Sequence, residues 1–253
     1  MGEIGRVVAL GASNLTLGLR SVASASRAAW GPKVEILAAL GHGRSYGAQS
    51  RLILRTLPGI LESGLWPALE SMPHLPTRAV ITDVGNDILY GFSAERTLAW
   101  VEEALGRLRS VADDITVTGL PLVSVRGLGR ARYLFLRSIL FPGCRLSLAQ
   151  VLESAEAVNS GLAALAIAQG VRFLRMDPAW YGFDPIHIRR SSRRSAWRAI
   201  LDVPAGSPDG GSSLREALRL SLMAPERRRI LGVERFTRQS GAVLPSGGRV
   251  WLF

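Results

Sequence analysis

Arg6-Val-Val-Ala-Leu-Gly-Ala-Ser13 is the stretch that decides the fold of this chain. Its β-branched and apolar run at 6–10 predicts a buried strand that ends at Gly11. A helical pattern extends from about residue 15 to about residue 29, so the strand leads through a short turn into a helix. This order places Ser13 at the carboxyl end of a strand, the edge at which parallel α/β sheets bind their ligands.

Four further apolar runs predict strands, at 34–37, 78–83, 115–119 and 171–174. Helical patterns lie between them, at about 48–63, 93–111 and 147–169. Gly170 is the expected stop of the last helix. A loop is expected around three prolines, Pro67, Pro73 and Pro76. The alternation of strands and helices predicts an α/β fold with a central parallel five-stranded sheet and helices on both faces.

Two segments do not follow this alternation of strands and helices. Residues 122–146 form an overlong connection, which is basic and strongly apolar at 130–141. The tail has a flexible stretch at 204–211, a short amphipathic helix at about 212–223 and a strand-like end at 249–253. We therefore assign 1–201 to one domain with an insertion at about 122–146. Residues 202–253 are a C-terminal extension that packs on the same domain or is partly flexible.

The composition is that of a folded, basic protein. The chain has 253 residues, of which 47 % are apolar, and this supports a packed core and excludes an intrinsically disordered chain. The 31 basic and 20 acidic side chains give a formal net charge of +11. Because Cys144 is the only cysteine, an intramolecular disulfide and a cysteine-rich zinc site are excluded.

The positive charge resides almost entirely in arginines, with Lys33 as the only lysine. They are spread along the chain, which indicates codon bias rather than selection for phosphate binding, so we expect no nucleic-acid partner. A weak contact of the arginines with an anionic membrane surface stays open. No run reaches the ~18–20 uninterrupted apolar residues of a membrane span, and the N-terminal apolar run is too short for a secretion signal. The expected location is the cytoplasm.

A base that works near pH 7 is most simply a histidine. His187 follows the last predicted strand, and Asp184 lies three residues before it. In a compact turn this spacing lets the carboxylate hold imidazole Nδ1, which leaves Nε2 free to accept a proton. The alternative is a solvated Asp–His pair on a surface loop. For Ser13 the alternative to a nucleophile is a plain helix N-cap, provided by Ser13 or Asn14.

The loops after the second and third predicted strands carry groups that stabilise an oxyanion. Gly41-His-Gly-Arg-Ser-Tyr-Gly47 lets backbone N–H groups approach a ligand closely. In Asp83-Val-Gly-Asn-Asp87, Asn86 presents a side-chain amide at the same edge, unless it only forms a turn or caps a helix. The chain lacks the Gly-x-Gly-x-x-Gly and Walker A patterns, so a nucleotide cofactor is not expected.

Ser, Gly, Asn and His thus follow the first, second, third and fifth predicted strands. This order resembles the SGNH (GDSL-type) hydrolase superfamily over residues 5–200. The matching blocks are Gly11–Leu15, Gly41–Ser45, Gly85–Asp87 and Asp184–His187. Three residues differ from the family pattern, which usually has Asp, Leu and Pro at the positions of Ala12, Asn14 and Ile188. The resemblance implies a three-layer α/β/α, flavodoxin-like sandwich.

The resemblance also implies a mechanism. Ser13 is the nucleophile, His187 the base and Asp184 the residue that orients it, while the Ser13 and Gly43 N–H groups and the Asn86 amide form the oxyanion hole. Gly41 is the alternative to Gly43. No metal or organic cofactor is implied. The expected activity is hydrolysis of a small-molecule, lipid or carbohydrate ester, of esterase, lipase or deacetylase type. The alternatives are an O-acyltransferase, a thioesterase or a non-catalytic membrane- or RNA-binding protein.

The apolar part of the insertion has two interpretations. It is either a helix that completes the core or a cap that lines an acyl pocket next to the site. The cap hypothesis predicts substrate contacts for Tyr133, Phe135 and Phe141.

Overall fold

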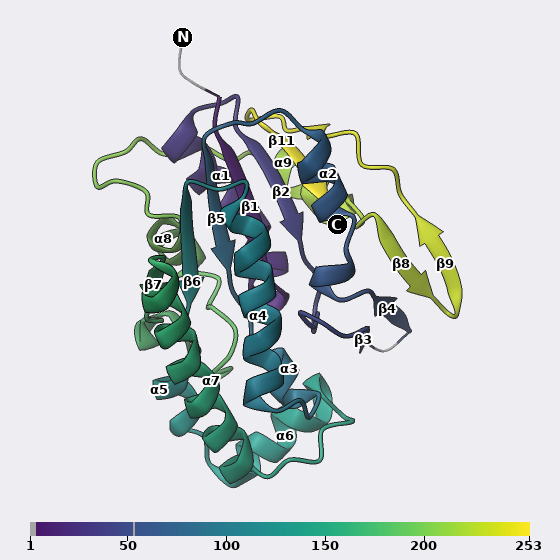
Figure 1. The fold of residues 1–253 in the computed structure, drawn as a ribbon, viewed down its shortest axis with the longest axis vertical. Helices are drawn as coiled ribbons and strands as arrows, with labels where there is room; N and C mark the ends of the chain where they lie inside the picture. Colours follow the sequence, from purple (N-terminus) through teal and green to yellow (C-terminus); the bar gives the residue numbers. More distant parts are fainter. Residues whose placement is uncertain (1–3, 53) are drawn as a thin grey trace.

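The computed structural model describes residues 4–52 and 54–253. Its centre is a seven-stranded sheet in the order β10-β11-β2-β1-β5-β6-β7, with helices on both faces (Figure 1). The five predicted strands are all present: β1 (Arg6–Leu10), β2 (Glu35–Ala39), β5 (Thr77–Ile81), β6 (Asp114–Thr118) and β7 (Arg172–Leu174). They pair in parallel with one another. The predicted α/β class is therefore confirmed.

The sheet is wider than the five strands expected. The end of the chain supplies β11 (Arg249–Leu252), which lies parallel to β2, and β10 (Ala242–Val243), which is antiparallel to β11. β2 is buried along most of its length, so its backbone N–H and C=O groups need partners within the protein. β11 supplies those partners on the side of β2 that faces away from β1. Part of the C-terminal extension thus belongs to the central sheet.

Alternation along β1 divides the core into two layers. Val8 and Leu10 face one layer of apolar side chains, and Val7 and Ala9 face the other. The first layer is covered by α2 (Leu65–Ser71), α4 (Ala94–Arg109) and α7 (Leu148–Gln169). The second is covered by α1 (Ser13–Trp30), α8 (Arg193–Ile200) and α9 (Leu214–Leu222).

Helices α4 and α7 both begin at a capping serine, and α7 ends at Gly170 as the sequence predicts. Ser93 Oγ accepts a hydrogen bond from the Arg96 N–H at the start of α4. Ser147 forms a capping box with Gln150 at the start of α7, and Gly170 ends α7 in the left-handed conformation with φ +63°. By length and composition, α7 is the one helix of the described ranges that is apolar enough to cross a membrane, but here its buried side packs on the sheet layer.

The helix expected at about 48–63 is wrong. The segment forms β3 (Ser50–Leu52), β4 (Arg55–Leu57) and the 3₁₀ turn η1 (Ile60–Glu62). β4 pairs with β8 (Arg227–Ile230), which pairs with β9 (Val233–Phe236), so a second, four-stranded antiparallel sheet forms in the order β3-β4-β8-β9. The Pro58-Gly59 pair interrupts a helix, and the strands that compete with it come from far along the chain.

The loop expected around the prolines is also only partly right, because α2 contains Pro67. A proline is tolerated there because it lies in the first turn, where the backbone N–H has no partner within the helix.

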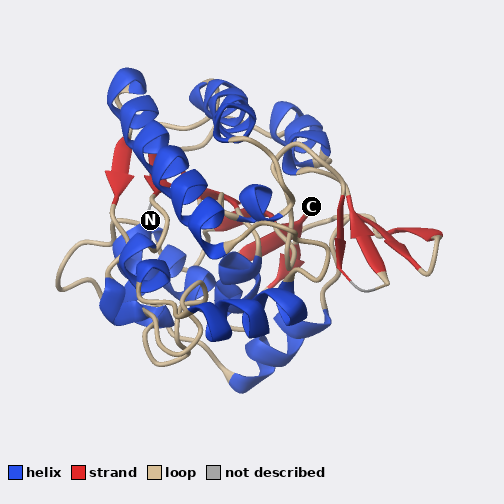
Figure 2. Cartoon of the chain, turned by 90° about the horizontal axis from the view of Figure 1, so that it is seen from below, coloured by secondary structure: helices blue, strands red, loops and turns tan. Residues whose placement is uncertain are grey.

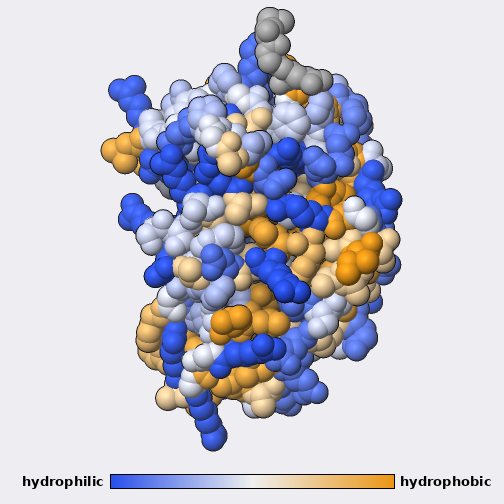
Figure 3. All heavy atoms as spheres, turned by 90° about the vertical axis from the view of Figure 1, so that its left-hand side faces the viewer, coloured by the Kyte–Doolittle hydropathy of each residue, from blue (hydrophilic) through white to orange (hydrophobic). Residues whose placement is uncertain are grey.

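The carboxyl ends of the parallel strands all meet at one end of the molecule. In Figure 1 the arrows of β1, β5 and β6 point toward this end, where α3 (Asn86–Leu89), α5 (Leu122–Arg126) and α6 (Arg130–Leu140) lie. Figure 2 looks onto this end and shows the small sheet projecting to one side of the helical layers. Figure 3 shows hydrophilic residues spread over the face that lies on the left in Figure 1, with hydrophobic ones among them.

Candidate active site

Ser13 is the first residue of α1 and lies where β1 ends. The N-cap residue is Ala12, so the alternative in which Ser13 or Asn14 is a plain N-cap is not realised. The Ser13 side chain is largely buried, and it borders a small hollow together with Asn86 and Ile186. Within the described residues, its hydroxyl forms no hydrogen bond, so the bond expected to His187 is not made in this structure. Such bonds are often loose until substrate binds.

Asn14 ties the serine turn to the histidine loop. Its Oδ1 accepts the Ile188 N–H at 2.8 Å, and its Nδ2 donates to the Ile186 carbonyl at 2.9 Å. These two residues flank His187 on either side, so the residue next to Ser13 is fastened to both neighbours of the histidine. Sequence analysis considers Asn14 as a helix cap and as a departure from the family pattern, whereas in the structure its side chain joins the serine turn to the histidine loop.

Asp83 fixes the start of α1 from the neighbouring strand. Its Oδ2 accepts the N–H groups of Ala12 at 2.7 Å and Leu15 at 3.2 Å, and its Oδ1 accepts Asn14 Nδ2 at 2.7 Å. A carboxylate at a helix N-terminus also interacts favourably with the helix dipole. Asp83 adopts φ +61°, which aspartate tolerates better than most residues. Sequence reasoning missed this role, because only the sheet brings β5 beside β1.

His187 and Asp184 form the expected pair. Asp184 Oδ2 lies 2.5 Å from His187 Nδ1, and Asp184 Oδ1 accepts the N–H groups of Ile186 at 3.1 Å and His187 at 3.2 Å. Burial by itself would raise the pKa of Asp184, but the hydrogen bond and charge of His187 and the two N–H groups outweigh burial and lower it. The ionised carboxylate therefore holds the proton on Nδ1 and leaves Nε2 as the acceptor.

The glycine loop and α3 bring the oxyanion candidates together. Asn86 is buried at the start of α3, and its Nδ2 lies 3.3 Å from the Arg44 carbonyl, next to Gly43. Gly43 has φ +67°, and a Cβ there would lie 3.1 Å from Tyr90 Oη, which donates to the Gly43 carbonyl at 2.6 Å. In the described part of the chain, the N–H groups of Ser13 and Gly43 have no acceptor.

Gly41 stands apart from this arrangement. Its carbonyl accepts the Arg44 N–H, and a Cβ on it would meet the Leu57 side chain at 2.1 Å. Gly41 therefore faces the apolar interior, and this placement favours Gly43 as the oxyanion glycine.

Two other carboxylates near the candidate site form hydrogen bonds with groups other than His187. Asp87 accepts hydrogen bonds from Ser45 Oγ and from the Tyr46 N–H, and it is fully buried. Burial raises the pKa of Asp87 to about 6, against the opposing effect of these two donors. Asp177 caps η2 (Pro178–Trp180) through the Ala179 N–H at 2.8 Å. Neither is bonded to His187, so Asp184 is the carboxylate that orients it.

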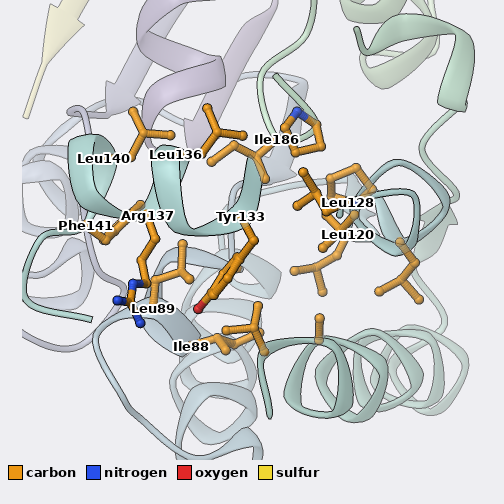
Figure 4. Close-up of a pocket in the computed structure, with 17 residues that line it drawn as sticks. Ile88, Leu89, Leu120, Leu128, Tyr133, Leu136, Arg137, Leu140, Phe141 and Ile186 are labelled. Carbon is orange, nitrogen blue, oxygen red and sulfur yellow. The ribbon is translucent and has the colours of Figure 1, made fainter. Parts of the chain in front are cut away.

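An apolar pocket of about 700 Å³, measured with its open mouth, adjoins the Ser13 hollow (Figure 4). Both are lined by Gly85, Leu89, Leu120, Pro121 and Ile186, so the two spaces lie against each other on these shared residues. Helix α6 forms one wall through the four side chains that share a face: Tyr133, Leu136, Arg137 and Leu140.

The three predicted substrate contacts do not all reach this pocket. Tyr133 and Phe141 line it, and both are buried. Phe135 does not, and it is 56 % exposed. The reason is helical geometry, because Phe135 is two positions from Tyr133 and therefore projects from the opposite side of α6. Among residues 4–52 and 54–253, no cluster of His, Cys, Asp or Glu suited to a metal ion occurs.

Solved structures with a similar fold include esterases. Est24, a carbohydrate acetylesterase from Sinorhizobium meliloti, superposes with a TM-score of 0.54 at 17 % identity over 78 % of this chain and 97 % of its own. The inhibitor-bound aryl esterase of M. smegmatis gives a TM-score of 0.53 at 14 % identity, over 78 % of this chain and 97 % of its own. No protein-family model and no curated protein sequence matches the chain significantly. At these identities the likeness establishes the fold.

Proposed function

We propose that this chain, which has the fold of the SGNH (GDSL-type) hydrolases, hydrolyses carboxylic esters with Ser13 as nucleophile. The observation that carries the proposal is the pair of Asn14 hydrogen bonds to Ile186 and Ile188. These bonds join the serine turn to both neighbours of His187, and they support the proposal together with the bond between His187 Nδ1 and Asp184.

The reaction proceeds in two steps. Ser13 Oγ attacks the acyl carbon while His187 Nε2 takes the hydroxyl proton, and the resulting imidazolium is stabilised by Asp184. The tetrahedral intermediate collapses, the C–O bond to the alcohol breaks, and His187 returns the proton to the leaving oxygen. Water then attacks the acyl-enzyme with His187 again as base, which releases the carboxylic acid and restores Ser13.

The negative charge of the intermediate needs preformed donors. The N–H groups of Ser13 and Gly43 are without acceptors among the described residues, and the Asn86 amide lies beside Gly43. Donors that are held in place before the reaction cost no reorganisation as charge develops, and each contributes about 3–4 kcal/mol to lowering the barrier.

The apolar pocket suits the acyl chain of the substrate. Its lining is almost entirely aliphatic and aromatic. Each methylene of the acyl chain that it removes from water therefore makes binding more favourable by at most ~0.8 kcal/mol. We therefore assign a preference for medium-length acyl chains over acetyl. The alcohol leaves toward the open side of the Ser13 hollow.

The proposal is tested with p-nitrophenyl esters of two to ten acyl carbons and a fluorophosphonate probe. We expect covalent labelling of the wild-type protein and a kcat/KM that rises from acetyl to octanoyl. Product analysis with and without an added alcohol separates hydrolysis from acyl transfer, and acyl thioesters test the thioesterase alternative. A protein that neither turns over any ester nor reacts with the probe would be non-catalytic, which contradicts the proposal.

Leu136→Trp, which fills the pocket, should lower kcat/KM for octanoyl esters by about tenfold or more and leave acetyl esters nearly unchanged. The matched control is Leu134→Trp, the same substitution on the outward face of the same helix, where the side chain is 42 % exposed. An equal loss for both chain lengths in Leu136→Trp, with an unchanged Tm, contradicts the acyl-pocket assignment.

A further inference from the structure

We propose that the small sheet binds the surface of anionic lipid membranes through its apolar tip, which we define as Leu54, Ile230, Leu231 and Val233. The β8–β9 turn and Leu54 meet at this tip. Arg55 is paired with Ile230 across β4 and β8, and the Leu231 N–H donates to the Leu54 carbonyl at 3.0 Å. Figure 1 shows β8 and β9 projecting from the body of the molecule.

The apolar tip is exposed. Leu54 is 55 %, Leu231 68 % and Val233 53 % exposed, and none of them belongs to either core layer. Four neighbouring aliphatic side chains at the end of a projecting hairpin are unfavourable in water, and an exposed apolar cluster of this kind marks an interaction site.

The backbone of the β8–β9 turn gives an independent indication. Leu231 has φ +50° and Gly232 has φ +82°, so both central residues of the turn are left-handed. A hairpin turn of this kind favours Asn-Gly or Asp-Gly, because a branched apolar side chain is strained at positive φ. Leu231 thus costs stability through its backbone conformation and gains none from burial within the chain. Burial of its side chain in an apolar phase outside the chain offsets this cost.

The charge around the apolar tip identifies the partner. Residues 50–57 and 226–238, which form the small sheet and its borders, contain seven arginines and two glutamates. Glu234 is paired with Arg229. In the described part of the chain, the exposed Arg51, Arg227 and Arg235 have no ion pair. Aliphatic side chains surrounded by arginines match an anionic bilayer, where the apolar groups enter the interface and the guanidinium groups bind lipid phosphates.

The location also suits a membrane-facing protein. β3 follows the glycine loop at 41–47 directly, so the small sheet borders the edge at which the candidate site opens. Docking through the apolar tip would hold that edge near the lipid surface. Membrane binding is nevertheless a separate property, since none of its residues belongs to the proposed triad or oxyanion hole.

Leu231→Asn separates docking from stability, because asparagine tolerates the left-handed conformation better than leucine. We expect the full-length variant to keep or raise its Tm, while its partition coefficient falls about tenfold or more on vesicles of phosphatidylcholine with 30 % phosphatidylserine. Co-sedimentation measures the partitioning. Arg235→Gln should lower it about fivefold, and added salt should weaken wild-type binding.

Leu222→Asn is the matched control, because Leu222 is 75 % exposed on α9 and lies outside the apolar tip. It should bind vesicles like the wild type, and Leu231→Asn should hydrolyse short soluble esters like the wild type. The proposal is overturned if the wild type ignores anionic vesicles, if it binds pure phosphatidylcholine equally well, or if Leu231→Asn binds unchanged. A wild-type dimer that dissociates in Leu231→Asn would assign the apolar tip to a second copy instead, which also overturns it.

Discussion

Ser13→Ala should abolish ester hydrolysis, with kcat falling on the order of 10⁵- to 10⁶-fold and labelling by the fluorophosphonate probe lost. The variant keeps the Asn14 and Asp83 hydrogen bonds that fix the turn, so fold and Tm should be unchanged. What it loses is the hydroxyl that we propose forms the acyl-enzyme. Steady-state kinetics and mass spectrometry of the labelled peptide measure the two effects.

Ser124→Ala is the control for this experiment, because Ser124 lies on α5 beside the pocket and outside the proposed triad. Its activity and labelling should equal those of the wild type. Labelling that persists in Ser13→Ala, or that maps to Ser45 or Ser124, would show that the nucleophile is another serine.

Asp184→Asn should lower kcat about 10⁴-fold with a much smaller change in KM. The asparagine oxygen can still accept the Ile186 and His187 N–H groups, so the loop should keep its shape. Its amide, however, presents an N–H to Nδ1 where the wild type presents an acceptor. The imidazole then carries its proton on Nε2 and has no lone pair there for the Ser13 proton.

Asp177→Asn is the matched control, since Asp177 caps a neighbouring turn and is not bonded to His187. It should retain wild-type kinetics. ¹⁵N NMR of His187 checks the physical reason, because Asp184→Asn should exchange the protonated nitrogen from Nδ1 to Nε2. Wild-type turnover in Asp184→Asn would mean that another carboxylate orients the histidine.

Local signals in the sequence predicted the parallel strands, the end of α7 at Gly170 and the residues that follow each strand. These signals work because strand burial, capping and turn chemistry depend on neighbours in the chain. Since every parallel strand ends at the same edge, the order of Ser13, Gly43, Asn86 and His187 was enough to place them at one end of the molecule. The pairing of His187 with Asp184 is equally local, because three residues of one turn contain it.

Only the tertiary structure decided what depends on distant partners. Within the segment expected to be helical, β4 pairs with β8 from residues 227–230 and β3 pairs with β4, and no local pattern contains the partner β8. Asp83 binds the serine turn because the sheet brings it next to the Ala12 N–H. Asn14 binds the histidine loop because the fold brings the Ile186 carbonyl next to its amide. The outward direction of Phe135 follows from the helical phase of α6 against the pocket. In each case a side chain or strand is assigned by a partner that is remote in sequence, and only folding brings the two together.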